Sequence, residues 1–146
     1  MMEAKDLVIE APRSPYETIN GYAILARTID KCRAAIADTA GEYHFDCPVD
    51  KMLFGFKNIS GEEFKTFVAT GASDEEIGKW VEDHGDVKTA DEVSAWSSAF
   101  KTDFSYTTDP NKSEWFKGEC ERLALNPETT TLFDYLEYDD KVSFSK

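Results

Sequence analysis

Helix start signals recur along this chain and limit what it can fold into. Ser14, Ser60, Ser73 and Thr89 are each followed three positions later by glutamate. In such a capping box the hydroxyl accepts a hydrogen bond from the third helical N–H, and the glutamate accepts one from the cap residue's own N–H. Both bonds form where a helix begins. The pattern therefore predicts four helix N-termini, with Pro15 at the first position of the earliest helix.

The apolar residues near these signals recur at the period of an α-helix. Leu25, Ile29, Cys32 and Ile36 mark one face of a long helix predicted over residues 20–40. Alternation of apolar and polar residues, which is typical of a half-buried strand, is nearly absent. We therefore predict an all-α fold of about seven short helices. The later apolar stripes start at Val49, Phe64, Ile77, Val93, Phe116 and Leu132.

The remaining segments fit one compact helical domain over residues 1–146. Residues 1–12 carry no helical stripe and are predicted to be an extended N-terminal segment. Residues 102–113, rich in Thr, Asp, Pro and Asn, are predicted to be a looser connection. At most minor strands are expected, near the termini, at residues 7–9 and 142–144.

The charge balance excludes two classes of partner. The chain has 29 acidic and 16 basic residues and a net charge of −13. Phosphate backbones and anionic lipids repel such a chain, so we expect neither nucleic acid nor a membrane surface as partner. No apolar stretch approaches the roughly 20 residues of a membrane helix. The three cysteines are an odd number without a C-x-x-C pair, which predicts reduced thiols and a cytoplasmic location.

The long predicted helix has an unusual polar face. Arg27, Asp30 and Lys31 share it with small apolar residues, whereas an exposed face usually carries Glu and Lys. Close packing by other elements would bury the three charges, which would then need partners. Asp30 is close to both cations in sequence and would compensate part of their positive charge. Two interpretations stay open: a structural ion-pair network and a binding site. The small neighbours are Ala23, Ala26, Ala34 and Ala35.

The loop over residues 41–51 concentrates reactive groups just before Pro48. His44 and Cys47 are three residues apart, and a thiolate at a helix N-terminus is stabilised by the helix dipole. A nearby histidine could act as its base. Because no second pair of metal ligands accompanies them, we predict no metal and no cofactor. The polar residues of the loop are Glu42, Tyr43, His44, Asp46, Cys47 and Asp50.

The first functional hypothesis is the binding of a small anionic or carboxylate ligand. Its site would lie where the Arg27–Lys31 face, which includes Asp30, meets residues 42–50. Arg27 and Lys31 would hold the anion, and Tyr43 and His44 would orient it.

The second hypothesis is an enzyme at the same place. His44 would be the general base, with Asp46 or Asp50 orienting its ring. Cys47 is the candidate nucleophile of this site.

The third hypothesis is an adaptor whose acidic second part binds a basic protein. Residues 61–146 carry most of the net negative charge. No pattern identifies such a partner. We interpret the carboxylates near the C-terminus as a solvated face; they are Asp134, Glu137, Asp139 and Asp140.

Several segments resemble the bacterial family catalogued as domain of unknown function 5069. In the first part these are Arg13-Ser14-Pro15, Gly21-Tyr22, residues 25–34, residues 41–45 and residues 47–50. Residues 73–77 and 133–140 resemble the same family. The resemblance implies a small, mostly helical bacterial protein. It implies no activity, so the three hypotheses stay open.

Overall fold

The regular secondary structure of the described part of the chain is helical. A computed structural model describes residues 4–103 and 112–144, and within them there are seven helices and no strand. The all-α fold predicted from the apolar period is therefore confirmed. None of the helices described is long and apolar enough to cross a bilayer. The helices are α1 (Leu25–Ala37), α2 (Pro48–Lys57), α3 (Gly61–Val68), α4 (Asp74–Asp83), α5 (Ala90–Lys101), α7 (Ser113–Arg122) and α8 (Leu132–Phe144).

Three of the four predicted capping boxes are formed. Ser60, Ser73 and Thr89 each accept a hydrogen bond from the third helical N–H, and the paired glutamate accepts from the cap. The prediction at Ser14 is wrong, because its hydroxyl accepts from Tyr16 in a turn that does not continue as a helix. Hydrogen bonds between this segment and distant parts of the chain determine its backbone path, and the local capping-box pattern does not.

The long helix is shorter than predicted. α1 begins at Leu25 because Ile24 adopts a left-handed conformation with φ 66°. The loop before it buries Tyr22 and Ile24, and the Ser97 hydroxyl bonds its backbone. At the other end Asp38, with φ 60°, caps the helix with bonds to two carbonyls of its last turn.

The two terminal segments that could have formed minor strands do not form them. Residues 7–9 form a turn, with Leu7 N–H bonded to the carbonyl of Thr39, and residues 142–144 continue α8. Of the looser connection predicted over 102–113, residues 104–111 lie outside the described part of the chain.

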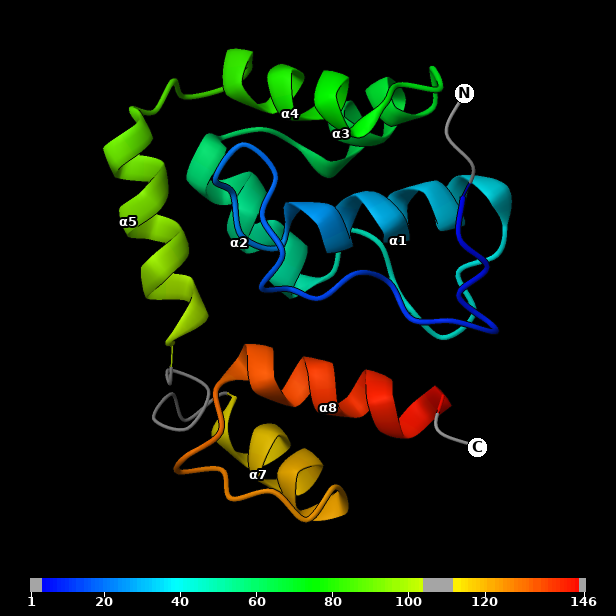
Figure 1. Cartoon of the computed structure of the whole chain (residues 1–146), viewed down its shortest axis with the longest axis vertical. Coiled ribbons are helices and arrows are strands. Elements are labelled where there is room, and N and C mark those ends of the chain that lie inside the picture. Colours follow the sequence, from blue (N-terminus) through cyan, green and yellow to red (C-terminus); the bar gives the residue numbers. More distant parts are fainter. Residues whose placement is uncertain (1–3, 104–111, 145–146) are drawn as a thin grey trace.

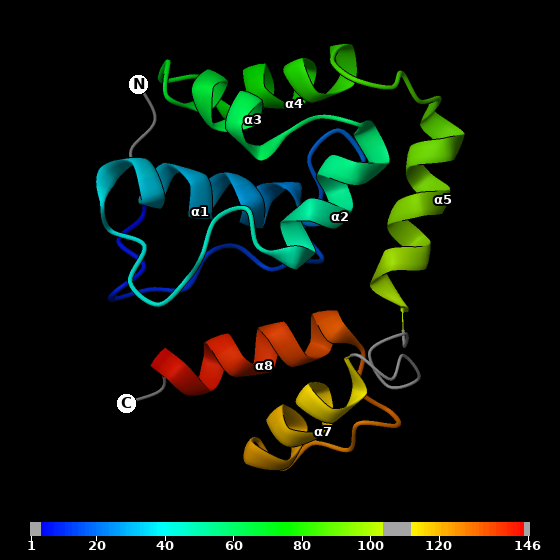
Figure 2. The same cartoon turned by 180° about the vertical axis from the view of Figure 1, so that it is seen from behind.

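The helices form three layers, seen from opposite sides in Figures 1 and 2. α1 and α2 lie in the middle, with α3 and α4 on one side and α7 and α8 on the other. α5 runs along one edge and connects the two outer layers (Figure 1). The N-terminal segment and the connection from α1 to α2 run between α1 and α8. The polar face of α1 is therefore turned toward α8 across these two segments.

Candidate functional site

The three charged residues of the polar face of α1 are buried, as the alanine-rich face predicts. Arg27, Asp30 and Lys31 are 4%, 4% and 5% exposed. Each pairs with a group from a different part of the chain, and none of the partners lies on α1. Asp30 was expected to compensate part of the charge of Arg27 and Lys31, but it does not pair with either of them.

Arg27 is joined to α8 by a two-point ion pair. Its Nη1 and Nη2 donate to the two carboxylate oxygens of Asp140 at 2.6 and 3.2 Å. Tyr43 donates its hydroxyl to the same carboxylate at 2.7 Å, and the guanidinium lies 5.6 Å from the Tyr43 ring centre. Burial and the bond to Asp140 raise the pKa of Tyr43, so its hydroxyl stays protonated and donates.

Lys31 fixes the start of α2. Its Nζ lies 2.9 Å from Asp50 Oδ2, 3.2 Å from the His44 carbonyl and 3.2 Å from Cys47 Sγ. Three acceptors thus surround the three protons of the ammonium. Asp50 is fully buried and also accepts from the Thr28 hydroxyl at 2.7 Å. Asp50 therefore holds the loop and the helix together and is closed to a ligand.

Asp30 belongs to a second ion-pair network. It accepts from the backbone N–H of Arg13 at 2.8 Å and from its guanidinium. Arg13 and Arg33 both also contact Asp74 at the start of α4, at 2.8 and 2.9 Å. This network joins the N-terminal segment, α1 and α4. Asp30 does not line the pocket described next.

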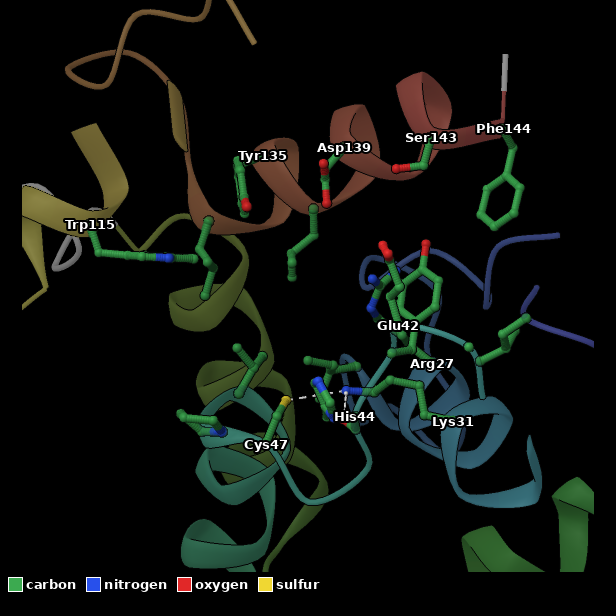
Figure 3. Close-up of a pocket in the computed structure, with 18 of the residues that line it drawn as sticks. Arg27, Lys31, Glu42, His44, Cys47, Trp115, Tyr135, Asp139, Ser143 and Phe144 are labelled. Carbon is green, nitrogen blue, oxygen red and sulfur yellow. Dashed lines mark hydrogen bonds between the residues drawn. The ribbon is translucent and has the colours of Figure 1, made fainter. Parts of the chain in front are cut away.

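A pocket of about 830 Å³ lies between α1, residues 41–49, α7 and α8. Of the residues proposed from the sequence, Arg27, Lys31, Tyr43, His44 and Cys47 line it. Figure 3 shows Lys31, His44 and Cys47 together on one wall, with Tyr135 and Asp139 on the facing helix. The remaining lining residues are Leu7, Val8, Ile24, Gly41, Glu42, Pro48, Val49, Lys112, Trp115, Leu132, Tyr135, Leu136, Asp139, Ser143 and Phe144.

Arg27 keeps donors that its structural partners do not use. Its hydrogen bonds all start at Nη1 and Nη2, and within residues 4–103 and 112–144 the Nε–H has no acceptor. Arg27 lines the pocket, and the edge formed by Nε and the second proton of Nη2 is the part of its guanidinium that has no acceptor in those ranges. That edge has the geometry that binds a carboxylate through two parallel hydrogen bonds.

His44 is exposed on the pocket wall, without the orienting carboxylate proposed for it. Asp46 pairs with Lys51 at 2.9 Å, and Asp50 is occupied as described. In the described ranges no hydrogen bond joins either carboxylate to the His44 ring. Those ranges also contain no cluster of three or more His, Cys, Asp or Glu side chains that could hold a metal ion.

The far wall of the pocket was missed by sequence reasoning. Leu132 and Leu136 on α8 line it, and Asp140 continues the same face one turn later. Asp140 is 7% exposed, so the interpretation of all four C-terminal carboxylates as solvated is wrong for this residue. Its position four residues after Leu136 was the available signal, because residues four apart share a helix face.

Comparison with known protein families identifies a match. The model of the family described as Domain of unknown function (DUF5069) matches residues 9–142, nearly the whole chain. The match confirms the family resemblance seen in the segments around Arg13, α1 and the loop before α2. No curated protein matches the chain.

Proposed function

This chain belongs to the DUF5069 family, and we propose that it binds a small organic carboxylate in the pocket between α1 and α8. The observation that carries the proposal is the unused donor edge of Arg27, which lines a pocket of about 830 Å³. That volume lies within the range of small-molecule sites, about 300–1,000 Å³.

The surroundings of Arg27 support a binding role. Asp140 and Tyr43 hold its guanidinium in one position, so little side-chain freedom remains to be lost when a ligand binds. Burial also lowers the local dielectric, which strengthens a charge-assisted hydrogen bond. Lys31 supports the site indirectly, because its ammonium holds the loop that carries His44.

Thermal unfolding with hexanoate and with hexanamide tests this proposal. The two probes match in shape and differ in the charge of the head group. We expect hexanoate to raise Tm with concentration, because a ligand that binds only the folded state stabilises it by mass action. Hexanamide should have a much smaller effect.

A matched pair of variants locates the effect. In Arg27→Met combined with Asp140→Leu both members of the pair become apolar, so no buried charge is left alone. The shift caused by hexanoate should vanish in this double variant and persist in Lys79→Met, which removes an exposed lysine of α4. A shift that survives in the double variant, or no shift in the wild type, would contradict the proposal.

We propose as second candidate an enzyme whose nucleophile is Cys47. The supporting observation is the distance of 3.2 Å between its Sγ and Lys31 Nζ at the start of α2. Cys32 and Cys120 are buried, and burial raises the pKa of the Cys32 thiol to about 12. Cys47 is therefore the one described thiol that a substrate in the pocket can reach.

An activated ester, p-nitrophenyl hexanoate, tests this candidate. The Cys47 sulfur would form a bond to the ester carbonyl carbon, the C–O bond would break, and p-nitrophenolate would leave. His44 would take the thiol proton as general base. We expect a burst of about one p-nitrophenolate per chain, absent in Cys47→Ala and slower in His44→Ala. Equal release by the wild type and Cys47→Ala would dismiss the thiol.

We also propose a cytoplasmic location. The support is that all three cysteines are free thiols, as is usual in a reducing compartment. Alkylation under denaturing conditions of the protein taken from its own cells, before any reductant is added, should modify all three. Recovery of an oxidised cysteine pair would contradict this location.

A further inference from the structure

We propose that the ligand is an amphipathic monocarboxylate with one unbranched apolar tail. This inference rests on the proposed function and names the ligand class for the same pocket. The carboxylate would lie on the free edge of Arg27, and the tail would extend along α8 toward Trp115.

Among the described residues that line the pocket, Arg27 presents a donor edge to which no acceptor is bound. The ammonium of Lys31 is surrounded by three acceptors, and the end of the Arg27 guanidinium is occupied by Asp140. Lys112, which also lines the pocket, has a contact of its own. Glu42 adds negative charge to the wall, and Asp139 adds a carboxylate that is paired with Arg122 at 2.9 Å. A second acidic group on the ligand would therefore be repelled by the wall carboxylates or be buried without a cationic partner. Dicarboxylates and phosphates are disfavoured for this reason.

The other end of the pocket is built for an apolar body. Leu132, Tyr135 and Leu136 line the pocket from α8, and Val49 lines it from the first turn of α2. Trp115 on α7 lines the same end, and 51% of its surface is exposed. Figure 3 shows Trp115 and Tyr135 on the side of the pocket away from Arg27 and Glu42. A tail that covers the indole would bury apolar surface that the free protein leaves in water.

The volume sets the size of the tail. A water molecule occupies about 30 Å³ of the liquid, and a methylene group is of similar size. A pocket of about 830 Å³ has the volume of roughly 27 such groups, and an acid of about 8 to 12 carbons, which takes about 300–420 Å³ with its two oxygens, would fill about half of it. Smaller acids would leave the Trp115 end empty.

Calorimetric titration with hexanoate, octanoate and decanoate, below their micelle concentrations, tests the class. Each methylene buried contributes about 0.8 kcal/mol, so Kd should fall about fourfold per added methylene. Octanedioate, which has the length of octanoate and a second carboxylate, should bind more than about tenfold more weakly, since charge burial without a partner is unfavourable.

A pair of aromatic variants tests the position of the tail. Trp115→Ala should weaken decanoate binding and change hexanoate binding little, because only the longer tail reaches the indole. Tyr138→Ala removes a similarly exposed aromatic residue of α8 that does not line the pocket, and should change neither. Thermal melts of both variants without ligand check that they are folded.

The outcomes separate this inference from the proposed function. Kd values independent of chain length, together with preference for hexanoate over hexanamide, would overturn the amphipathic class and leave carboxylate binding intact. Binding of octanedioate as tight as that of octanoate would overturn the single-headed class. Equal affinity for decanoate and decanamide would overturn both proposals, because the head group would then contribute nothing.

Discussion

Replacing Arg27 by methionine is the most direct test of how the pocket is assembled. The substitution keeps the aliphatic part of the side chain and removes the guanidinium. Asp140 then stays buried on α8 with the Tyr43 hydroxyl as its remaining partner. A buried carboxylate without its cation is costly, because desolvation of the charge is no longer offset by the pair.

The magnitude follows from burial. The side chains of Arg27 and Asp140 are 4% and 9% exposed. Removing one member of such a pair typically costs about 3–5 kcal/mol. Tyr43 still donates to Asp140, so we expect the lower end, about 3 kcal/mol. The control is Lys79→Met, whose pair with Asp83 is mostly exposed and contributes less than about 0.5 kcal/mol.

Urea unfolding followed by far-UV circular dichroism measures the difference. With a slope of about 2 kcal/mol per molar urea, a loss of 3 kcal/mol lowers the midpoint by about 1.5 M. The corresponding fall in Tm is about 6–12 °C for a chain of this size. Lys79→Met should lower the midpoint by less than about 0.3 M.

The double variant Arg27→Met, Asp140→Leu completes the thermodynamic cycle. Apolar residues of similar volume often replace a buried ion pair at little cost, so the double variant should be more stable than Arg27→Met alone. If Arg27→Met lowers stability no more than Lys79→Met, or if the double variant loses the sum of both single losses, the pair is not a buried, coupled unit.

Two further predictions concern the acid side of the stability curve and two glycines. Partial burial acts to raise the pKa of Asp74, but hydrogen bonds from Arg13 lower this pKa overall. The Asp74 carboxylate therefore contributes its full share of folding stability above the unfolded-state pKa of about 3.9. This contribution is lost as the pH falls through the lower pKa of the folded state. The stability difference between wild type and Asp74→Asn should be constant from about pH 7 to 5 and shrink below about pH 4; a difference that grows in acid would show that the sign is wrong. Gly85→Ala should lower stability by more than about 2 kcal/mol, because φ is +66° and a Cβ would collide with the Lys57 carbonyl oxygen. Gly118→Ala in α7, where a Cβ meets nothing within 4 Å, should raise the free energy of unfolding by about 0.5–1 kcal/mol. Thermal melts measure both variants, and Tm shifts of the same sign would refute the contrast between the two glycines.

The helices were predictable because their signals are local. A cap and its glutamate are three residues apart, and a buried stripe repeats every three or four residues, so the pattern and its cause lie within one turn. Ser60, Ser73 and Thr89 therefore begin helices as predicted. The same locality explains the failure at Ser14, where bonds from Arg13 to Asp30, 17 residues away, determine the path of the chain.

The burial of Arg27, Asp30 and Lys31 was also visible in the sequence, because alanines around a charge indicate close packing. Which carboxylate balances each charge was not visible. Asp140 lies 113 residues from Arg27, and the pair forms only because α8 folds back across the N-terminal segment onto α1. Local periodicity determines which faces of a helix are buried. The neighbour that covers each face depends on the packing of the whole chain, so the partners and the pocket between them were decided by tertiary structure alone.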